Sequence, residues 1–174
     1  HTLRTNSDTE VIIHLYEEYG ENCLKKLNGM FAFLIWDSNA KRAFIARDRI
    51  GIKPIYYYYD SSCLLIASEI KALLKHPDIS AAPNWDGIND YFTFQFCLGE
   101  KTLFQGINKL LPGNFIIFDP DKPGSFHVQK YWDIDYTIDT YHTEDYFVDT
   151  LSRLLEDSVR LQLRSDVPVG AHLS

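Results

Sequence analysis

The chain has 174 residues, 45% of them hydrophobic, and its formal net charge is −7. A chain of this length buries a core without disulfides or metals, and 25 aromatic residues exclude whole-chain disorder. Its longest apolar run, 31–36, is far shorter than the roughly 20 residues of a membrane span. The 17 basic residues are scattered, whereas nucleic-acid surfaces need clustered cations. We therefore expect a soluble protein with no nucleic-acid and no membrane partner.

The three cysteines, Cys23, Cys63 and Cys97, are an odd number and contain no CxxC pair. Neither a zinc site nor a disulfide framework is indicated, so each is expected to be a small buried hydrophobic residue. No histidine pair has metal-ligand spacing. The polar first residues show no signal peptide. A reducing cytoplasm is the expected location.

Hydrophobic periodicity divides the chain into a helical start, a strand-rich middle and a helical end. Ser7 and Glu10 have the spacing of a capping box, and Gly20 is expected to end the first helix. Two hairpins then indicate an antiparallel sheet of at least four strands. The expected strands are 30–36, 42–46, 55–59, 64–68, 115–118, 126–132 and 169–174, and the further helices are 22–27, 69–74, 85–96 and 144–163.

Few side chains suggest chemistry by themselves. Asp48 stands between Arg47 and Arg49, which predicts a salt-bridged loop carboxylate. Asp8 lies in the first helical turn, where a carboxylate stabilises the helix dipole. From the residues alone we predict an α+β domain, a polar linker and the start of another domain.

Eight short motifs follow one another along the chain. They are SDTE (7–10), LNGMFAF (27–33), ARDRIGIKPIYY (46–57), ASEIKAL (67–73), TLF (102–104), PG (112–113), YW (131–132) and SDVPVG (165–170). Each motif is weak alone. Together, in this order, they resemble the glutamine-hydrolysing asparagine synthetases over essentially the whole chain.

This resemblance implies a partial Ntn-hydrolase-type fold, an antiparallel β sandwich with flanking helices, followed by the first helix and strand of an α/β nucleotide-binding domain. Residues 1–132 would be the C-terminal part of a class II glutamine amidotransferase (glutaminase) domain. Residues 133–142 would be a linker, and residues 143–174 the start of the ATP-binding domain.

The resemblance also implies an ATP-dependent carbon-nitrogen ligase. In this family an N-terminal cysteine attacks glutamine, and the released ammonia amidates aspartate through an aspartyl-adenylate. ATP and Mg²⁺ are the implied cofactors, glutamine and aspartate the substrates, and homodimer formation stays open. The chain begins at His1 and does not include that cysteine, so we assign no catalytic residue and expect this fragment alone to be inactive.

Three residues match functional positions of the family. Asp8 resembles the carboxylate that holds the α-amino group of glutamine. Leu173 and Ser174 match the entrance to the ATP-pyrophosphatase loop, whose N–H groups bind phosphate. No metal ligand is assigned. The 47–54 segment is expected either to shape the floor of the glutaminase site and the ammonia path or to be purely architectural.

Two other functions stay open. A related glutamine amidotransferase that amidates a sugar or peptide, in surface-polysaccharide or natural-product biosynthesis, would have the same architecture here. A non-catalytic binding or scaffold domain is the other alternative.

Overall fold

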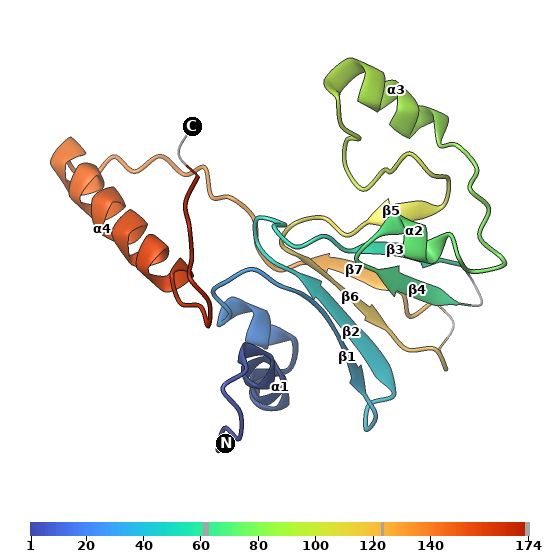
Figure 1. Cartoon of the computed structure of the whole chain (residues 1–174), viewed down its shortest axis with the longest axis horizontal. Coiled ribbons are helices and arrows are strands. Elements are labelled where there is room, and N and C mark those ends of the chain that lie inside the picture. Colours follow the sequence, from blue (N-terminus) through green and yellow to red (C-terminus); the bar gives the residue numbers. More distant parts are fainter. Residues whose placement is uncertain (61–62, 123, 173–174) are drawn as a thin grey trace. The chain divides into compact units, whose positions relative to one another are not determined.

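The structure, a computed structural model, describes residues 1–60, 63–122 and 124–172 (Figure 1). It contains two compact units, His1–Ile134 and Asp135–Ser174. The helices are α1 (Asp8–Tyr19), the 3₁₀ helix η1 (Gly20–Lys25), α2 (Ile70–Leu73), α3 (Trp85–Phe94) and α4 (Glu144–Gln162). The strands are β1 (Ala32–Asp37), β2 (Arg42–Arg47), β3 (Tyr56–Tyr59), β4 (Leu64–Ala67), β5 (Ile107–Lys109), β6 (Asn114–Phe118) and β7 (His127–Lys130).

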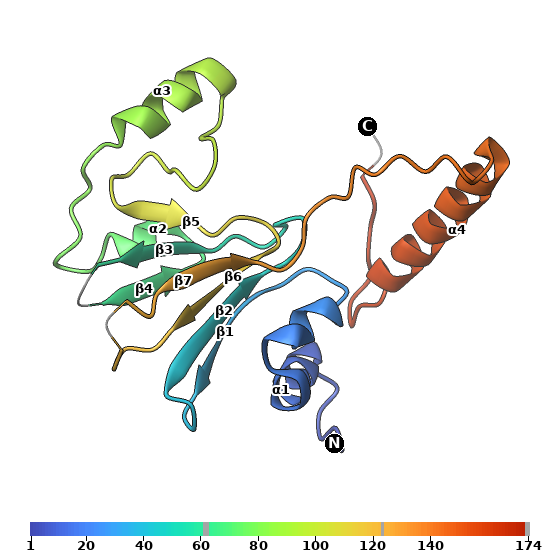
Figure 2. The ribbon, with the colours of Figure 1, turned by 180° about the vertical axis from the view of Figure 1, so that it is seen from behind.

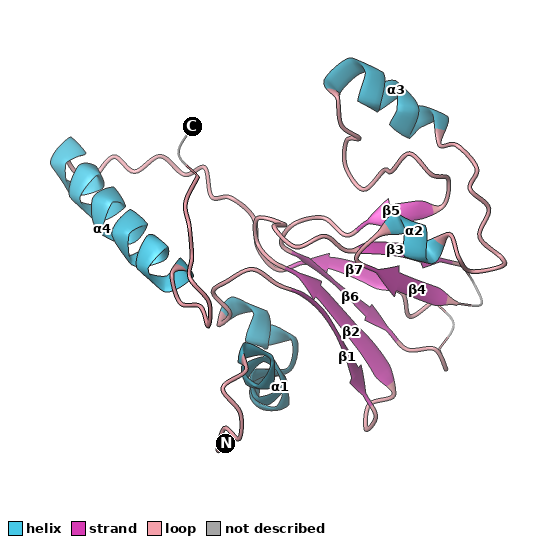
Figure 3. Ribbon diagram, viewed as in Figure 1, coloured by secondary structure: helices cyan, strands magenta, loops and turns pink. Residues whose placement is uncertain are grey.

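The first unit contains two antiparallel sheets (Figure 3), which confirms the predicted α+β class. Their strand orders are β1-β2-β6-β7 and β4-β3-β5. Both predicted hairpins form, but the prediction that they share one sheet is wrong. Strand β2 pairs with β6 and strand β3 pairs with β5, so partners distant in sequence complete each hairpin separately.

The two sheets pack face to face. Ile45 and Ile116 of the larger sheet belong to one buried cluster with Tyr57 of the smaller sheet. The preceding residue of β2, Phe44, points to the opposite face, as the two-residue period of a strand requires. There it joins a second cluster with Leu15 of α1. Burying such a side chain contributes about 1.5–3 kcal/mol.

Helices cover the outer faces of both sheets. Figure 2 shows α1 beside β1 and β2, and a third cluster joins Leu73 of α2 to Ile107 of the smaller sheet. The unit is therefore layered as helix, sheet, sheet, helix. Strand β2 is buried along most of its length because both of its faces are covered.

Two ends of the prediction differ from the structure. The strand expected at 169–174 is wrong over its described part, because residues 169–172 are irregular. A strand needs a neighbouring ladder for its N–H and C=O groups, and the described residues of the second unit contain no strand that could supply one. The predicted residues Leu173 and Ser174 lie outside the described residues.

The second unit consists of α4 and irregular segments. Thr143 begins the helix, and its side chain accepts the Tyr146 N–H at 3.3 Å. The helix predicted at 144–163 is confirmed, and it exposes large apolar side chains, with Leu151 67% and Leu155 62% accessible. In the described part of the chain, no helix is long and apolar enough to cross a membrane.

Candidate functional site

The N-terminal end of α1 is fixed by side chains that bind backbone N–H groups. Ser7 is the N-cap, as predicted, and its hydroxyl accepts an N–H of the first turn at 3.3 Å. Glu10 does not complete the capping box, because its carboxylate accepts the N–H groups of Arg4 and Thr5 at 2.8 and 2.7 Å. The Ser7 N–H donates instead to the Thr5 hydroxyl at 3.2 Å. The segment before the helix turns back and brings these nearer donors to Glu10.

Asp8 is the first residue of α1, and its side chain is exposed. The Thr9 hydroxyl donates to its carboxylate at 3.5 Å, the upper limit for a hydrogen bond. The helix N-terminus favours a negative charge at this position. The structure thus presents a carboxylate on a well-fixed helix end, accessible to a cationic group.

Asp48 is the organising centre of the loop after β2. Only 1% of the residue is exposed, and its carboxylate accepts the N–H groups of Ile50, Ile52 and Lys53 at 3.2, 3.0 and 3.0 Å. Burial acts to raise the pKa of Asp48, but hydrogen bonds to backbone groups, first those of Lys53 and Ile52, together outweigh it and lower the pKa. The predicted salt bridge is wrong, because backbone N–H groups stabilise this charge.

The two flanking arginines bind carbonyl groups. The Arg47 guanidinium donates to the carbonyl oxygens of Lys53, Leu110 and Gly51 at 2.8, 2.5 and 2.7 Å. Arg49 donates to the Leu27 carbonyl at 2.8 Å. The charged side chains of Arg47, Asp48 and Arg49 therefore hold the 47–54 loop in place through hydrogen bonds to backbone groups. Ile50, within this hydrogen-bonded segment, remains 66% exposed. This arrangement supports an architectural role for the loop.

A cavity of about 360 Å³ lies beside this loop. Asn114, which is 7% exposed, contributes a buried Oδ1 without a hydrogen-bond partner among the described residues. Cationic and aromatic side chains are among the residues that line this cavity. The lining residues are Arg49, Ile50, Leu111, Pro112, Asn114, Lys130, Trp132, Asp133 and Ile134.

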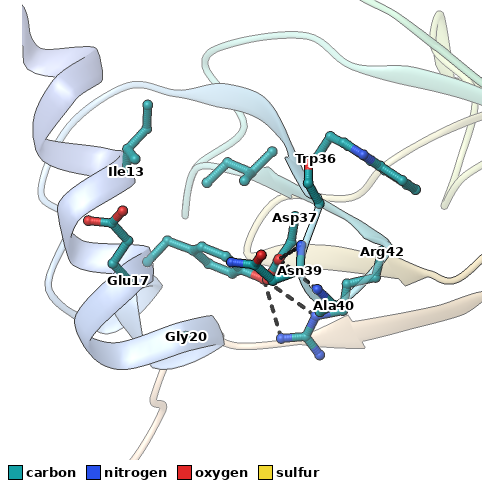
Figure 4. Close-up of a pocket in the computed structure, with 11 residues that line it drawn as sticks. Ile13, Glu17, Gly20, Trp36, Asp37, Asn39, Ala40 and Arg42 are labelled. Atoms are coloured by element: carbon teal, nitrogen blue, oxygen red, sulfur yellow. Dashed lines mark hydrogen bonds between the residues drawn. The ribbon is translucent and has the colours of Figure 1, made fainter.

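A second cavity, of about 500 Å³, lies between α1 and the β1–β2 hairpin (Figure 4). The Tyr16 hydroxyl donates to Asp37 at 3.0 Å and accepts from Arg42 at 3.3 Å. Arg42 also donates to Glu21 at 3.3 Å. The pKa of Tyr16 is raised, chiefly by burial. These groups satisfy one another, so the network ties the helix to the hairpin.

This network is not among the sequence predictions, although the sequence contains one signal for it. Asp37 binds the turn N–H groups of Asn39 and Ala40 at 3.0 and 2.8 Å. The hairpin register also pairs Asp37 with Arg42. Opposite charges on directly opposed strand positions attract each other, so a hairpin prediction with its register implies this pair.

A family model and the curated relatives agree on the family to which this chain is similar. The family model described as a glutamine amidotransferase domain matches residues 1–132. The glutamine-hydrolysing asparagine synthetase 3 of Bacillus subtilis is 39% identical over all of the chain, which corresponds to 28% of that protein. The putative glutamine-hydrolysing asparagine synthetase 2 of Methanocaldococcus jannaschii is 37% identical over 98% of the chain and 33% of that protein.

A fungal protein with a different name is similar to nearly the same extent. The amidase chry2 of Gibberella zeae is 35% identical over 97% of the chain and 25% of that protein. The chain therefore spans a quarter to a third of the length of the curated relatives that it matches.

Proposed function

The chain belongs to the glutamine amidotransferase domain family, and we propose that it is part of a glutamine-hydrolysing asparagine synthetase. In that enzyme, glutamine hydrolysis supplies ammonia, and ATP activates aspartate as an aspartyl-adenylate that the ammonia attacks. The observation that carries the proposal is the 39% identity to the Bacillus subtilis asparagine synthetase over the whole chain. Because the chain is 28% of that relative's length, most of the synthetase chemistry is assigned to polypeptide outside this chain.

Within this proposal, Asp8 holds the α-ammonium group of glutamine. Its place at the capped N-terminal end of α1, where the Ser7 hydroxyl fixes the first turn, supports this role. A charge-assisted hydrogen bond of this kind contributes about 1.5–3 kcal/mol. We also assign the 47–54 loop an architectural role, which the hydrogen bonds of Asp48 and Arg47 to its backbone support.

The domain assignment follows the same proposal. Residues 1–132 belong to the glutaminase domain, residues 133–142 are the linker, and residues 143–174 begin the ATP-binding domain. Leu173 and Ser174 are assigned to the ATP site. ATP and Mg²⁺ are the cofactors, and homodimer formation is a further part of the proposal. The buried thiol of Cys23 suits a reducing compartment, which supports assignment to the cytoplasm.

The test compares two nitrogen sources in the full-length protein that contains this chain. Asp8→Asn is expected to lower kcat/KM for glutamine by about ten- to a hundredfold, since a charge-assisted bond to the substrate is weakened. Asparagine formation from free ammonia should be unchanged, because the glutamine pocket is then not used. Asp86→Asn is the matched control, because Asp86 is another exposed aspartate in the first turn of a helix.

The outcomes separate the role of Asp8 from the identity of the enzyme. Equal loss with both nitrogen sources, or equal loss in Asp86→Asn, would refute the assignment of Asp8. Failure of the unaltered protein to form asparagine from aspartate, ATP and ammonia would refute the synthetase itself.

A second candidate function is favoured by the 35% identity to the amidase chry2. In this case the glutaminase unit is the same, and the ammonia acceptor is a sugar, a peptide or another natural-product precursor. To decide between the two candidates, glutamine hydrolysis by the full-length protein is measured in the presence of different candidate acceptors. Glutamine hydrolysis that aspartate does not stimulate, but that a sugar or peptide acceptor does, would support the second candidate.

A further inference from the structure

Two histidines and a glutamate converge on the surface of α1. His14 and Glu17 are three residues apart, which places them on one face of the helix. The ring of His1 stacks on that of His14 with centroids 4.4 Å apart. The Glu17 carboxylate oxygen Oε2 lies 3.1 Å from His14 Nδ1 and 3.6 Å from His1 Nδ1. One ligand atom from each residue lies within 4.8 Å of the other two.

These separations fit the first coordination shell of a small divalent metal. Zn²⁺ binds imidazole nitrogen and carboxylate oxygen at about 2.0–2.2 Å, so adjacent ligand atoms of a tetrahedral site lie roughly 3.4 Å apart. The two distances from Glu17 Oε2 already have this value to within a few tenths of an ångström. The side chains of His1 and Glu17 are 36% and 54% exposed, so solvent can reach the site.

The outer nitrogen of each imidazole faces its own carboxylate. His1 Nε2 lies 3.0 Å from Glu18 Oε1, and His14 Nε2 lies 3.5 Å from Glu10 Oε1. His14 Nε2 is buried and forms no hydrogen bond with the described residues. Histidines that ligate metals donate their second N–H to a carboxylate, which fixes the tautomer and increases ligand basicity. The His1 ring has such a partner in Glu18 at hydrogen-bond distance, and the His14 ring has Glu10 next to its unpartnered Nε2.

The charge of the cluster also favours a cation. The Glu10 carboxylate lies 3.5 Å from His14 Nε2. Glu17 and Glu18 are exposed carboxylates that approach the same two rings. Two imidazoles among three carboxylates form a set of nitrogen and oxygen donors that suits a dication.

We propose that His1 Nδ1, His14 Nδ1 and Glu17 Oε2 bind one divalent transition-metal ion of the Zn²⁺ type, with water as the fourth ligand. Glu10 and Glu18 orient the imidazoles. Such an ion would fasten the residues before Asp8 to the body of α1. The site is independent of the proposed glutamine chemistry, because it uses none of the residues assigned to it.

The test measures Zn²⁺ binding by titration calorimetry at about pH 7.5, where imidazole is neutral. For this test, the chain is produced with a short extension before His1, so that a free α-amine at His1 cannot chelate the metal. One equivalent of Zn²⁺ should bind, and Co²⁺ should give the visible absorption of a tetrahedral site. His14→Ala is expected to weaken binding by at least roughly tenfold. His76→Ala is the control, because His76 is another partly exposed histidine, at 36%, that lies beside a carboxylate, that of Asp78.

A second variant tests the outer carboxylates. Glu18→Gln should weaken Zn²⁺ binding roughly tenfold with the stoichiometry unchanged, and circular dichroism checks that α1 persists in every variant. The proposal is overturned by the absence of Zn²⁺ binding to the unaltered chain. It is equally overturned if His14→Ala binds as tightly as the unaltered chain, or if His76→Ala loses as much affinity as His14→Ala.

Discussion

Replacing Asp48 by asparagine tests whether the buried carboxylate organises the 47–54 loop. One carboxylate oxygen accepts two N–H groups, from Ile50 and Ile52, and the other accepts the Lys53 N–H. In Asp48→Asn the amide oxygen can still accept two of them. The amide NH₂ then faces the Lys53 N–H, so that two donors oppose each other.

The expected cost follows from these contacts. One charge-assisted hydrogen bond is lost and two others lose the charge of their acceptor, which together lower the free energy of unfolding by about 2–4 kcal/mol. For a unit of this size, that corresponds to a decrease in Tm of about 5–15 °C. Urea unfolding followed by circular dichroism measures the difference. Asp121→Asn, an exposed turn aspartate, is the matched control and should change stability by less than about 0.5 kcal/mol.

The pH dependence of the difference provides a second measurement. The native pKa of Asp48 is lowered, so its stabilisation is complete above the unfolded pKa of about 3.9. It is lost as the pH falls through the lower native pKa. The gap between the native protein and Asp48→Asn should therefore be constant from about pH 7 to pH 5 and shrink below about pH 4. A variant as stable as Asp121→Asn, or a gap that grows on acidification, would refute the reasoning.

Two further predictions use matched pairs. Gly113 and Gly99 both have positive φ, at 66° and 57°, but an added Cβ would lie 2.5 Å from the Trp132 carbonyl oxygen only at Gly113. Gly99→Ala should lower the free energy of unfolding by about 1–2 kcal/mol because of the backbone conformation alone. Gly113→Ala should lower it clearly more in the same urea assay. Equal losses in the two variants would contradict the close approach of the Trp132 carbonyl to Gly113. Burial raises the pKa of Cys23 to about 11, so iodoacetamide at about pH 8 should leave it unmodified in the native chain and alkylate it in urea, as read by peptide mass spectrometry. Native alkylation at the unfolded rate would show that the thiol is not buried.

Local signals predicted the parts of the fold that depend on local physics. Ser7 caps α1 and Gly20 ends it, because both effects act within one helical turn. Strand β5 was not predicted, because its three residues, Ile107–Lys109, carry too little periodicity and become a strand by pairing with β3. The assignment of hairpins to separate sheets likewise depends on partners distant in the sequence.

The candidate site shows the same division. The salt bridge predicted for Asp48 was based on its two arginine neighbours in sequence. Successive side chains of extended backbone point in opposite directions, so these neighbours are poor candidates for contact. The groups that do stabilise Asp48 lie two to five residues ahead, and only the folded loop brings them back. The role of Asp8 came from the family resemblance and stays a prediction.

The way in which the 47–54 loop neutralises its charges affects its response to ionic strength. Dissolved ions screen exposed ion pairs. An example is the pair of Lys130 and Asp133, in which Nζ and Oδ2 lie 2.6 Å apart at the surface. The charges of Asp48 and Arg47 are compensated mainly by peptide dipoles that are covalently part of the loop, with the Leu110 carbonyl as a further partner of Arg47, and these groups are partly shielded from water. High salt should therefore leave the conformation of this loop unchanged, and the loop would keep its shape across cellular conditions that weaken surface ion pairs.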